Sequence, residues 1–182
     1  DEGQYNAVAL IPDSAWGKRV LAAFQDELEK RDGKLLAARS YPDDSADYAD
    51  VIRDVLLLDE SYARRDRLAA NVGKKLEFKP RRRQDVDLVF IAANATKGKQ
   101  LRPQLRFHYA ANIPTYATSA IYKPGSTDNA DINGTLFPDM PWLLKPTQAV
   151  IYDQSVLDKY RGTSSIQLAR FYAMGYDAYH LS

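Results

Sequence analysis

The sequence predicts an α/β protein with a Rossmann-like, doubly wound parallel sheet, and three observations support this fold class. Short apolar runs rich in strand formers alternate along the chain with segments whose apolar residues recur at helical spacing. The run at residues 88–93 contains no polar residue, as expected of a strand buried on both faces. Successive strands are separated by crossover segments, and crossovers between parallel strands are right-handed. The alternation therefore favours helices on both faces of one sheet.

Five strands are expected, and each is a short apolar run bounded by turn-forming residues. The first of them ends at Pro12, and residues 12–17 form a tight loop. The strands cover residues 5–11, 34–41, 88–93, 114–118 and 134–137.

Helices are expected between these strands. Ser14 is the predicted N-cap of a helix over residues 15–30, which Asp32 and Gly33 end. A second helix is expected over residues 47–58. A third is expected over residues 97–109, with Pro103 as a kink or a late start.

The chain divides into two predicted parts. Residues 5–145 form an α/β lobe, interrupted by an insertion at residues 59–83 that extends the second helix through Leu68 and closes near Gly73. Residues 146–182 have no strand pattern and indicate two more helices, which are split at Gly162. Their expected ranges are residues 149–160 and 164–179.

Composition excludes several classes of protein. The chain has no cysteine, which excludes disulfides and thiolate chemistry, and its 25 basic and 24 acidic residues give a net charge of +1. No global field for nucleic acid is therefore present. No apolar run is long enough to span a membrane. Because the chain opens on Asp1 rather than on a signal peptide, we interpret it as a mature or truncated sequence.

Motifs for catalysis and for cofactors are absent. The sequence lacks a glycine-rich dinucleotide loop, a phosphate-binding loop, a nucleophile elbow and a zinc-protease motif. His108 is expected at the end of a helix and His180 near the chain end, so neither is assigned a catalytic role. We therefore assign no catalytic residue, no cofactor and no metal, and predict that the protein is not an enzyme.

Four aspartates precede the second helix and leave two alternatives open. They could hold a hard cation, or they could cap the helix and complement its dipole, which is the commoner arrangement. These residues are Asp43, Asp44, Asp47 and Asp50.

Charge is segregated along the middle of the chain. Residues 40–60 hold seven acids and one arginine, a net charge of −6, whereas residues 61–83 hold nine bases and two acids, a net charge of +7. The two segments either pair with each other or present a surface to an anionic partner. Arg81, Arg82 and Arg83 have the same two interpretations: they bind phosphate or carboxylate, or they form a rim tied to neighbouring acids. Few aromatic residues accompany them, so nucleic acid is not an expected partner.

A proline-bracketed apolar block follows the last strand. Residues 137–144 include Met140 and Trp142, and loops after strands line the ligand crevice of a doubly wound sheet. Trp142 either plugs the edge of the sheet or contacts a partner or a second lobe.

Five groups of residues together resemble one known family. The sequence is similar to the C-terminal domain of the LppC/LpoA family, outer-membrane lipoproteins that activate class A penicillin-binding proteins. The match runs over most of residues 5–179, and the arginine triplet and the Asp-Met-Pro-Trp block are its more specific parts. The groups are Ala7, Leu10, Ile11 and Pro12 with Trp16 and Gly17; Arg81, Arg82 and Arg83 with Asp85 and Asp87; Tyr116, Ala117, Thr118 and Ser119; Asp139, Met140, Pro141 and Trp142; and residues 171–179.

The resemblance implies a type I periplasmic-binding-protein fold, in which two Rossmann-like lobes are joined by crossovers. On this basis residues 5–145 are one lobe, and residues 146–182 are trailing helices that belong to the crossover and the second lobe. The loops after the first, third and fourth strands face the interlobe cleft in solute-binding relatives. The implied cleft candidates are Ser14, Trp16, Asn94 and Ser119. Ser14 and Asn94 are also ordinary turn residues at strand ends, and that alternative stays open.

The resemblance further implies a non-catalytic regulatory domain that binds and activates a class A penicillin-binding protein and so supports peptidoglycan synthesis. It places the full-length protein in the periplasm, held at the outer membrane by a lipid anchor on an N-terminal part outside this sequence. The alternative is a periplasmic receptor for a small molecule such as an amino acid or a wall fragment. The residues expected to contact the synthase are Arg64, Arg65, Arg81, Arg82, Arg83, Asp139, Met140 and Trp142.

Overall fold

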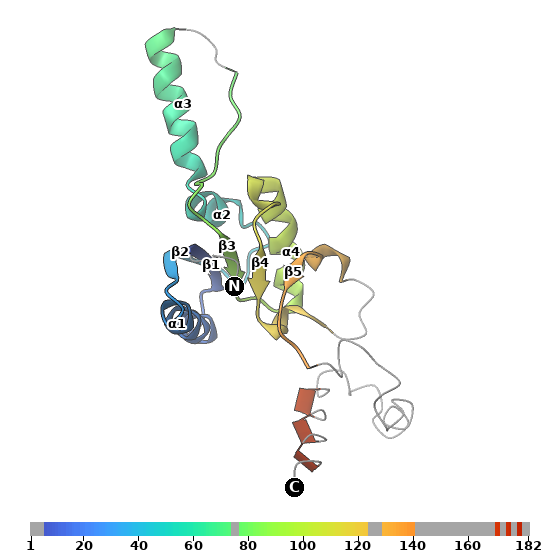
Figure 1. The fold of residues 1–182 in the computed structure, drawn as a ribbon. Coiled ribbons are helices and arrows are strands. Elements are labelled where there is room, and N and C mark those ends of the chain that lie inside the picture. Colours follow the sequence, from blue (N-terminus) through green and yellow to red (C-terminus); the bar gives the residue numbers. More distant parts are fainter. Residues whose placement is uncertain are drawn as a thin grey trace.

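A sheet of five parallel strands forms the centre of the computed structural model (Figure 1). The structure describes residues 6–73, 77–123, 129–140, 170, 171, 174, 175, 178 and 179. The strand order is β2-β1-β3-β4-β5. The strands are β1 (Asn6–Pro12), β2 (Lys34–Tyr41), β3 (Leu88–Ile91), β4 (Thr115–Ala117) and β5 (Thr135–Leu136). The predicted strands and their parallel arrangement are confirmed, with each of the last three strands shorter than its apolar run.

Residues of β1 alternate between two hydrophobic clusters, one on each face of the sheet. Ala7, Ala9 and Ile11 face the cluster that α1 (Ala15–Glu29) covers, where the rings of Phe24 and Phe90 stack with centroids 4.1 Å apart. Val8 and Leu10 face the cluster built with α2 (Ala49–Val55) and α4 (Ala95–Leu105). The doubly wound α/β class predicted from the sequence is therefore confirmed (Figure 1).

The start of α1 lies close against the end of β1. The hydroxyl of Ser14 accepts a hydrogen bond from the Gly17 amide at 3.1 Å, which confirms the predicted N-cap. A β-carbon built on Gly17 would lie 2.2 Å from the carbonyl oxygen of Pro12. Only glycine therefore permits this helix to approach the strand so closely.

The helix predicted over residues 47–58, with its extension through Leu68, is two helices, so a continuous helix is wrong. α2 (Ala49–Val55) ends before Leu57, whose φ of 54° is left-handed, and α3 (Leu58–Val72) begins directly after it. Leu56 and Leu58, on either side of this break, are both buried. The break redirects the chain so that α3 projects away from the sheet (Figure 1). Gly73 closes α3 at a φ of 68°, as predicted.

α4 (Ala95–Leu105) begins two residues earlier than predicted, because the side chain of Asn94 caps it by accepting from the Lys97 amide at 2.9 Å. Pro103 lies inside this helix. A π-helical segment, η1 (Arg106–Ala110), follows and loses helical dihedrals at His108 and Tyr109, and the φ of Tyr109 is 65°. The regular helix expected through residue 109 therefore stops at Leu105. Two short 3-10 turns, η2 (Ser119–Ile121) and η3 (Ala130–Ile132), separate β4 from β5.

The final part of the chain is described at six residues. Residues 170, 171, 174, 175, 178 and 179 are helical and fall within the helix predicted over 164–179, whereas the helix predicted over 149–160 lies outside the described residues. No helix in the described ranges combines the length and the apolar character needed to cross a membrane.

Candidate functional site

Loops at the carboxyl ends of the strands line a pocket of about 290 Å³. Three of the four predicted cleft residues, Ser14, Trp16 and Asn94, meet there, as their positions after β1 and β3 require. Ala120 lines the pocket in place of Ser119, whose backbone carbonyl instead accepts a hydrogen bond from Arg170 at 2.8 Å. Three of the four cleft candidates therefore line one pocket, which we call the strand-end pocket, and their role in binding stays a prediction.

Polar atoms around the strand-end pocket are already bonded within the protein. The side-chain oxygens of Ser14 and Asn94 cap α1 and α4, which is the turn-residue alternative. The Tyr41 hydroxyl donates to the Ala92 carbonyl at 2.7 Å, and burial raises the pKa of that hydroxyl. Lys97 donates to the Ser45 carbonyl at 2.8 Å. A small ligand would therefore meet few polar side-chain atoms without an internal partner.

The acidic segment, residues 40–60, pairs mostly with arginines outside the basic segment. Arg53 lies 2.8 Å from Asp50 and 3.2 Å from Asp59, and Arg39 pairs with Asp54. Within the described ranges, the pair between Arg64 and Glu60, at 3.6 Å, is the one ion pair that joins the acidic to the basic segment. The basic charge of residues 61–83 is thus left largely unneutralised by the acids before it. Asp47 accepts from the Ala49 amide at the start of α2, which supports a capping role for the aspartates.

The three consecutive arginines have different environments. Arg83 forms a bidentate pair with Asp85, both contacts being 2.8 Å, and this hydrogen-bonded pairing holds the pKa of the Asp85 carboxyl below its usual value. Arg82 donates to the backbone carbonyl of Arg83, and Asp87 accepts from the Asn6 amide. Within the described residues, Arg81 and Arg82 form no ion pair. Of the predicted contacts between the arginine triplet and neighbouring acids, the pair of Arg83 with Asp85 is present. Asp87 instead accepts from a backbone amide.

A groove runs between α3 and residues 77–83, which return alongside that helix (Figure 1). We call α3 and residues 77–83 together the basic arm. The groove has a volume of about 450 Å³, with Leu68 and Phe78 among its apolar residues. Four basic residues and one acid also line it, a net charge of +3. These residues are Arg64, Arg65, Lys79, Arg81 and Glu77.

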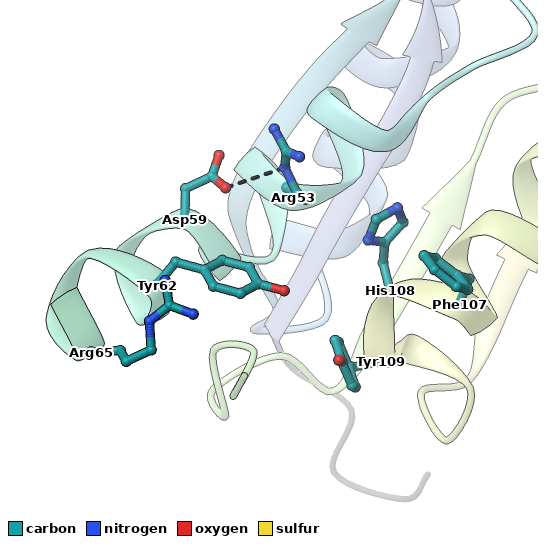
Figure 2. Close-up of a pocket in the computed structure, with 7 residues that line it drawn as sticks. All are labelled: Arg53, Asp59, Tyr62, Arg65, Phe107, His108 and Tyr109. Carbon is teal, nitrogen blue, oxygen red and sulfur yellow. Dashed lines mark ion pairs between the residues drawn. The ribbon is translucent and has the colours of Figure 1, made fainter. Parts of the chain in front are cut away.

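A second pocket, of about 400 Å³, adjoins the groove of the basic arm (Figure 2). Its walls come from α2, α3 and η1, and we call it the aromatic pocket. It is lined by Tyr62, Phe107, His108 and Tyr109, together with Arg53, Asp59 and Arg65. The sequence places His108 late in a helix beside Phe107 and Tyr109, and none of the three was predicted to belong to a site. Three consecutive ring-bearing residues, Phe107, His108 and Tyr109, at the end of a helix were the sequence feature that could have indicated this pocket.

Charge in the aromatic pocket is low near neutral pH. Partial burial, aided by the nearby Arg53, lowers the pKa of the His108 imidazole, so this ring is uncharged at pH 7. The guanidinium of Arg65 lies over the rings of Tyr62 and Phe78, 5.5 and 5.2 Å from their centroids. Arg65 lines both the aromatic pocket and the groove of the basic arm, so the two are adjacent.

Asp139, a predicted partner contact, is buried and already paired within the protein. Its side chain is 2% exposed and accepts two hydrogen bonds from Arg170, at 2.6 and 3.1 Å. The Met140 amide donates to the same carboxylate at 2.9 Å. Trp142 lies outside the described residues. The Asp-Met-Pro-Trp block therefore offers Met140, which is half-buried, as its described candidate for a partner contact.

The described residues define the class of the protein as a doubly wound α/β domain with grooves suited to binding. No group of three or more metal-ligating side chains occurs in the described ranges. A family model described as "LppC putative lipoprotein" matches residues 1–182, and the chain belongs to this family.

Relatives of known sequence and structure agree with this assignment. The chain is 31% identical to "Penicillin-binding protein activator LpoA" of Vibrio antiquarius, covering 99% of this chain and 30% of the relative. It is 25% identical to the protein of that name from Vibrio cholerae, with the same coverage. The chain thus spans about a third of the length of these relatives.

Two solved structures share the fold. The LpoA C-domain from Haemophilus influenzae, described as a regulator of PBP1A, superposes with a TM-score of 0.63 at 22% identity, covering 99% of this chain and 48% of that one. A crystal form of Haemophilus influenzae LpoA gives 0.64 at 22% identity, covering 99% of this chain and 27% of that one.

Proposed function

We propose that this chain is a non-catalytic regulatory domain that binds a class A penicillin-binding protein and stimulates its peptidoglycan synthesis. The names of the relatives support the class of partner. The longer protein acts in the periplasm and is held at the outer membrane by a lipid on its N-terminal part. Family membership supports this location.

The observation that carries the proposal is the basic arm. α3 projects from the sheet (Figure 1). Leu68 and Val72 on this helix are 54% and 50% exposed. Arg64 and Arg65 pair with Glu60 and Asp66 at the surface, whereas Arg81 and Arg82 form no ion pair within the described residues. A mixed apolar and basic surface of this kind suits a protein partner with an acidic patch. Arg64, Arg65, Arg81 and Arg82 are the contact residues we retain from the sequence prediction. Arg83 is less available, because its side chain is 13% exposed and already paired with Asp85.

Activation follows from a difference in affinity. A bound regulator shifts its partner toward an active conformation only if it binds that conformation more tightly than the inactive one. A tenfold difference corresponds to about 1.4 kcal/mol. A few contacts made by the basic arm to the active state alone would supply such a difference.

The alternative is a periplasmic receptor for a small molecule bound in the strand-end pocket. The meeting of Ser14, Trp16 and Asn94 favours it. The internal bonds of the Ser14 and Asn94 oxygens disfavour it. Its test is a rise in melting temperature on adding amino acids or wall fragments, since a ligand at 100 times Kd stabilises by about 2.7 kcal/mol.

The test of the main proposal is a titration of this chain against the periplasmic part of its cognate class A penicillin-binding protein at low and high salt. We expect saturable binding that weakens with salt, because exposed charges are screened beyond about 10 Å at 0.1 M. Arg81→Glu is expected to weaken binding about tenfold. Arg19→Glu, on α1, changes the net charge by the same amount as Arg81→Glu and serves as the control. Absence of binding, or equal effects of both variants, would contradict the proposal.

A further inference from the structure

The chain holds two aromatic side chains at its surface where α4 leads into β4. Tyr109 has a φ of 65°, a left-handed conformation that is unfavourable for a residue other than glycine. Its side chain is 41% exposed, and that of its neighbour Phe107 is 79% exposed. Burial therefore does not account for a tyrosine at a position where glycine is the favoured residue.

These rings form one wall of the aromatic pocket, opposite Tyr62 and Arg65 of α3 (Figure 2). Arg53, on α2, is held by its contact with Asp59, as the dashed line in Figure 2 marks. A cavity of about 400 Å³ among such residues has room for an apolar or aromatic side chain.

Charge increases from the aromatic pocket toward the basic arm. The pocket holds Arg53, Arg65 and Asp59, a net charge of +1 while His108 is neutral, and the adjoining groove has a net charge of +3. Because Arg65 lines both, a ligand could extend from one to the other. The complementary ligand has an apolar group at one end and several carboxylates along its length.

The position of the pocket leaves the strand-end pocket accessible. η1 precedes β4 and the α2–α3 break precedes β3, so the aromatic pocket lies toward the amino ends of the strands. The strand-end pocket lies at their carboxyl ends. A segment docked in the aromatic pocket would therefore not compete with an occupant of the other.

We propose that the aromatic pocket and the basic arm together dock an extended acidic segment of a partner protein. One apolar or aromatic side chain of that segment enters between Tyr62 and Tyr109, and its carboxylates contact Arg64, Arg65 and Arg81. The inference rests on the proposed function, that the chain binds a partner protein, and adds which kind of segment it recognises. The opposite charge of the groove and the exposed rings beside it support this choice of ligand.

The test uses short fluorescent peptides and this chain, followed by anisotropy. The first peptide holds one phenylalanine flanked by aspartates and glutamates, a second replaces the acids with lysines, and a third replaces the phenylalanine with glycine. We expect saturable binding of the first and at least about tenfold weaker binding of the other two.

Tyr109→Gly separates a binding role from a structural one. Glycine relieves the left-handed backbone, so the melting temperature should stay unchanged or rise, while affinity for the acidic peptide should fall about fivefold or more. Arg65→Ala should weaken binding to a similar degree. Phe171→Ala removes another exposed aromatic, one that lines neither pocket, and should have no effect.

Three results would overturn the inference. The first is equal binding of the acidic and basic peptides, and the second is an unchanged affinity of Tyr109→Gly for the acidic peptide. The third is displacement of the peptide by vesicles of anionic phospholipid, together with loss of vesicle binding in Tyr109→Gly and Arg65→Ala. Failure of the proposed function has a different signature. In that case the acidic peptide binds as expected, but the penicillin-binding protein does not.

Discussion

Arg170 and Asp139, separated by 31 residues, form a bidentate ion pair with a buried carboxylate. The same guanidinium donates to the backbone carbonyls of Ser119 and Tyr122, at 2.8 and 3.4 Å. One side chain near the end of the chain therefore joins the loops that follow β4 and β5. This contact ties part of the segment predicted to belong to a second lobe onto the first.

The two partners of this pair should respond differently to mutation. Arg170→Ala leaves the Asp139 carboxylate buried without its cation, and breaking a buried pair costs about 3–5 kcal/mol. Because Arg170 is 35% exposed, we discount this to about 2–3 kcal/mol. Asp139→Asn leaves Arg170 able to reach solvent and should cost less. Urea denaturation measures both, and a larger loss for Asp139→Asn would contradict this account.

Gly17→Ala should destabilise the fold by about 1–3 kcal/mol, as overpacking does. The added β-carbon would lie 2.2 Å from the backbone oxygen of Pro12, which cannot move without displacing β1 from its neighbours. Gly175→Ala is the matched control, because a β-carbon there meets nothing within 4 Å and alanine favours a helix. Thermal unfolding of the two variants should show a lower midpoint for Gly17→Ala and an equal or higher one for Gly175→Ala.

His108 should make stability depend on pH in the mildly acidic range. Its pKa in the folded protein is lowered below 6.5 by partial burial and by Arg53, with Asp47 opposing the shift. The unfolded chain therefore binds the proton more readily, and stability falls as pH decreases from about 6.5 toward the folded pKa. His108→Gln should remove this part of the pH dependence. The measurement is the melting temperature of both proteins between pH 7.5 and pH 5. The same pH dependence in the variant and the original protein would refute this role of His108.

Arg102 is a buried cation with unusual surroundings. This residue is only 4% exposed, and its Nε and Nη1 atoms have no hydrogen-bond partner among the described residues. Burial, together with repulsion from Arg106, lowers the pKa of this guanidinium. Arg102→Met keeps the side-chain stem and removes the unsatisfied groups, so we expect a gain of about 1 kcal/mol or more. Arg102→Ala leaves a cavity and is the control. If Arg102→Met destabilises the protein as much as Arg102→Ala does, the charge of Arg102 is itself needed for stability.

Local signals predicted the parallel sheet and the start of α1. Ser14 caps α1 as its position after β1 and before an apolar period indicated, because capping depends on residues three apart. The strand-end pocket was also partly predictable, since loops after parallel strands meet at one edge. The aromatic pocket was not, because Tyr62 and Tyr109 come from elements whose packing no local pattern records.

Sequence alone therefore determined the α/β class, the caps and the segregation of charge, because these depend on neighbours along the chain. Tertiary structure decided where the helix breaks at Leu57 and which arginines form no ion pair. Burial of Leu56 and Leu58 outweighs the local preference for one continuous helix. Arg170 pairs with Asp139, 31 residues away, which only the folded chain brings within reach, while Arg81 stays exposed beside α3. The basic arm is the result, and its shape depends on long-range packing rather than on composition.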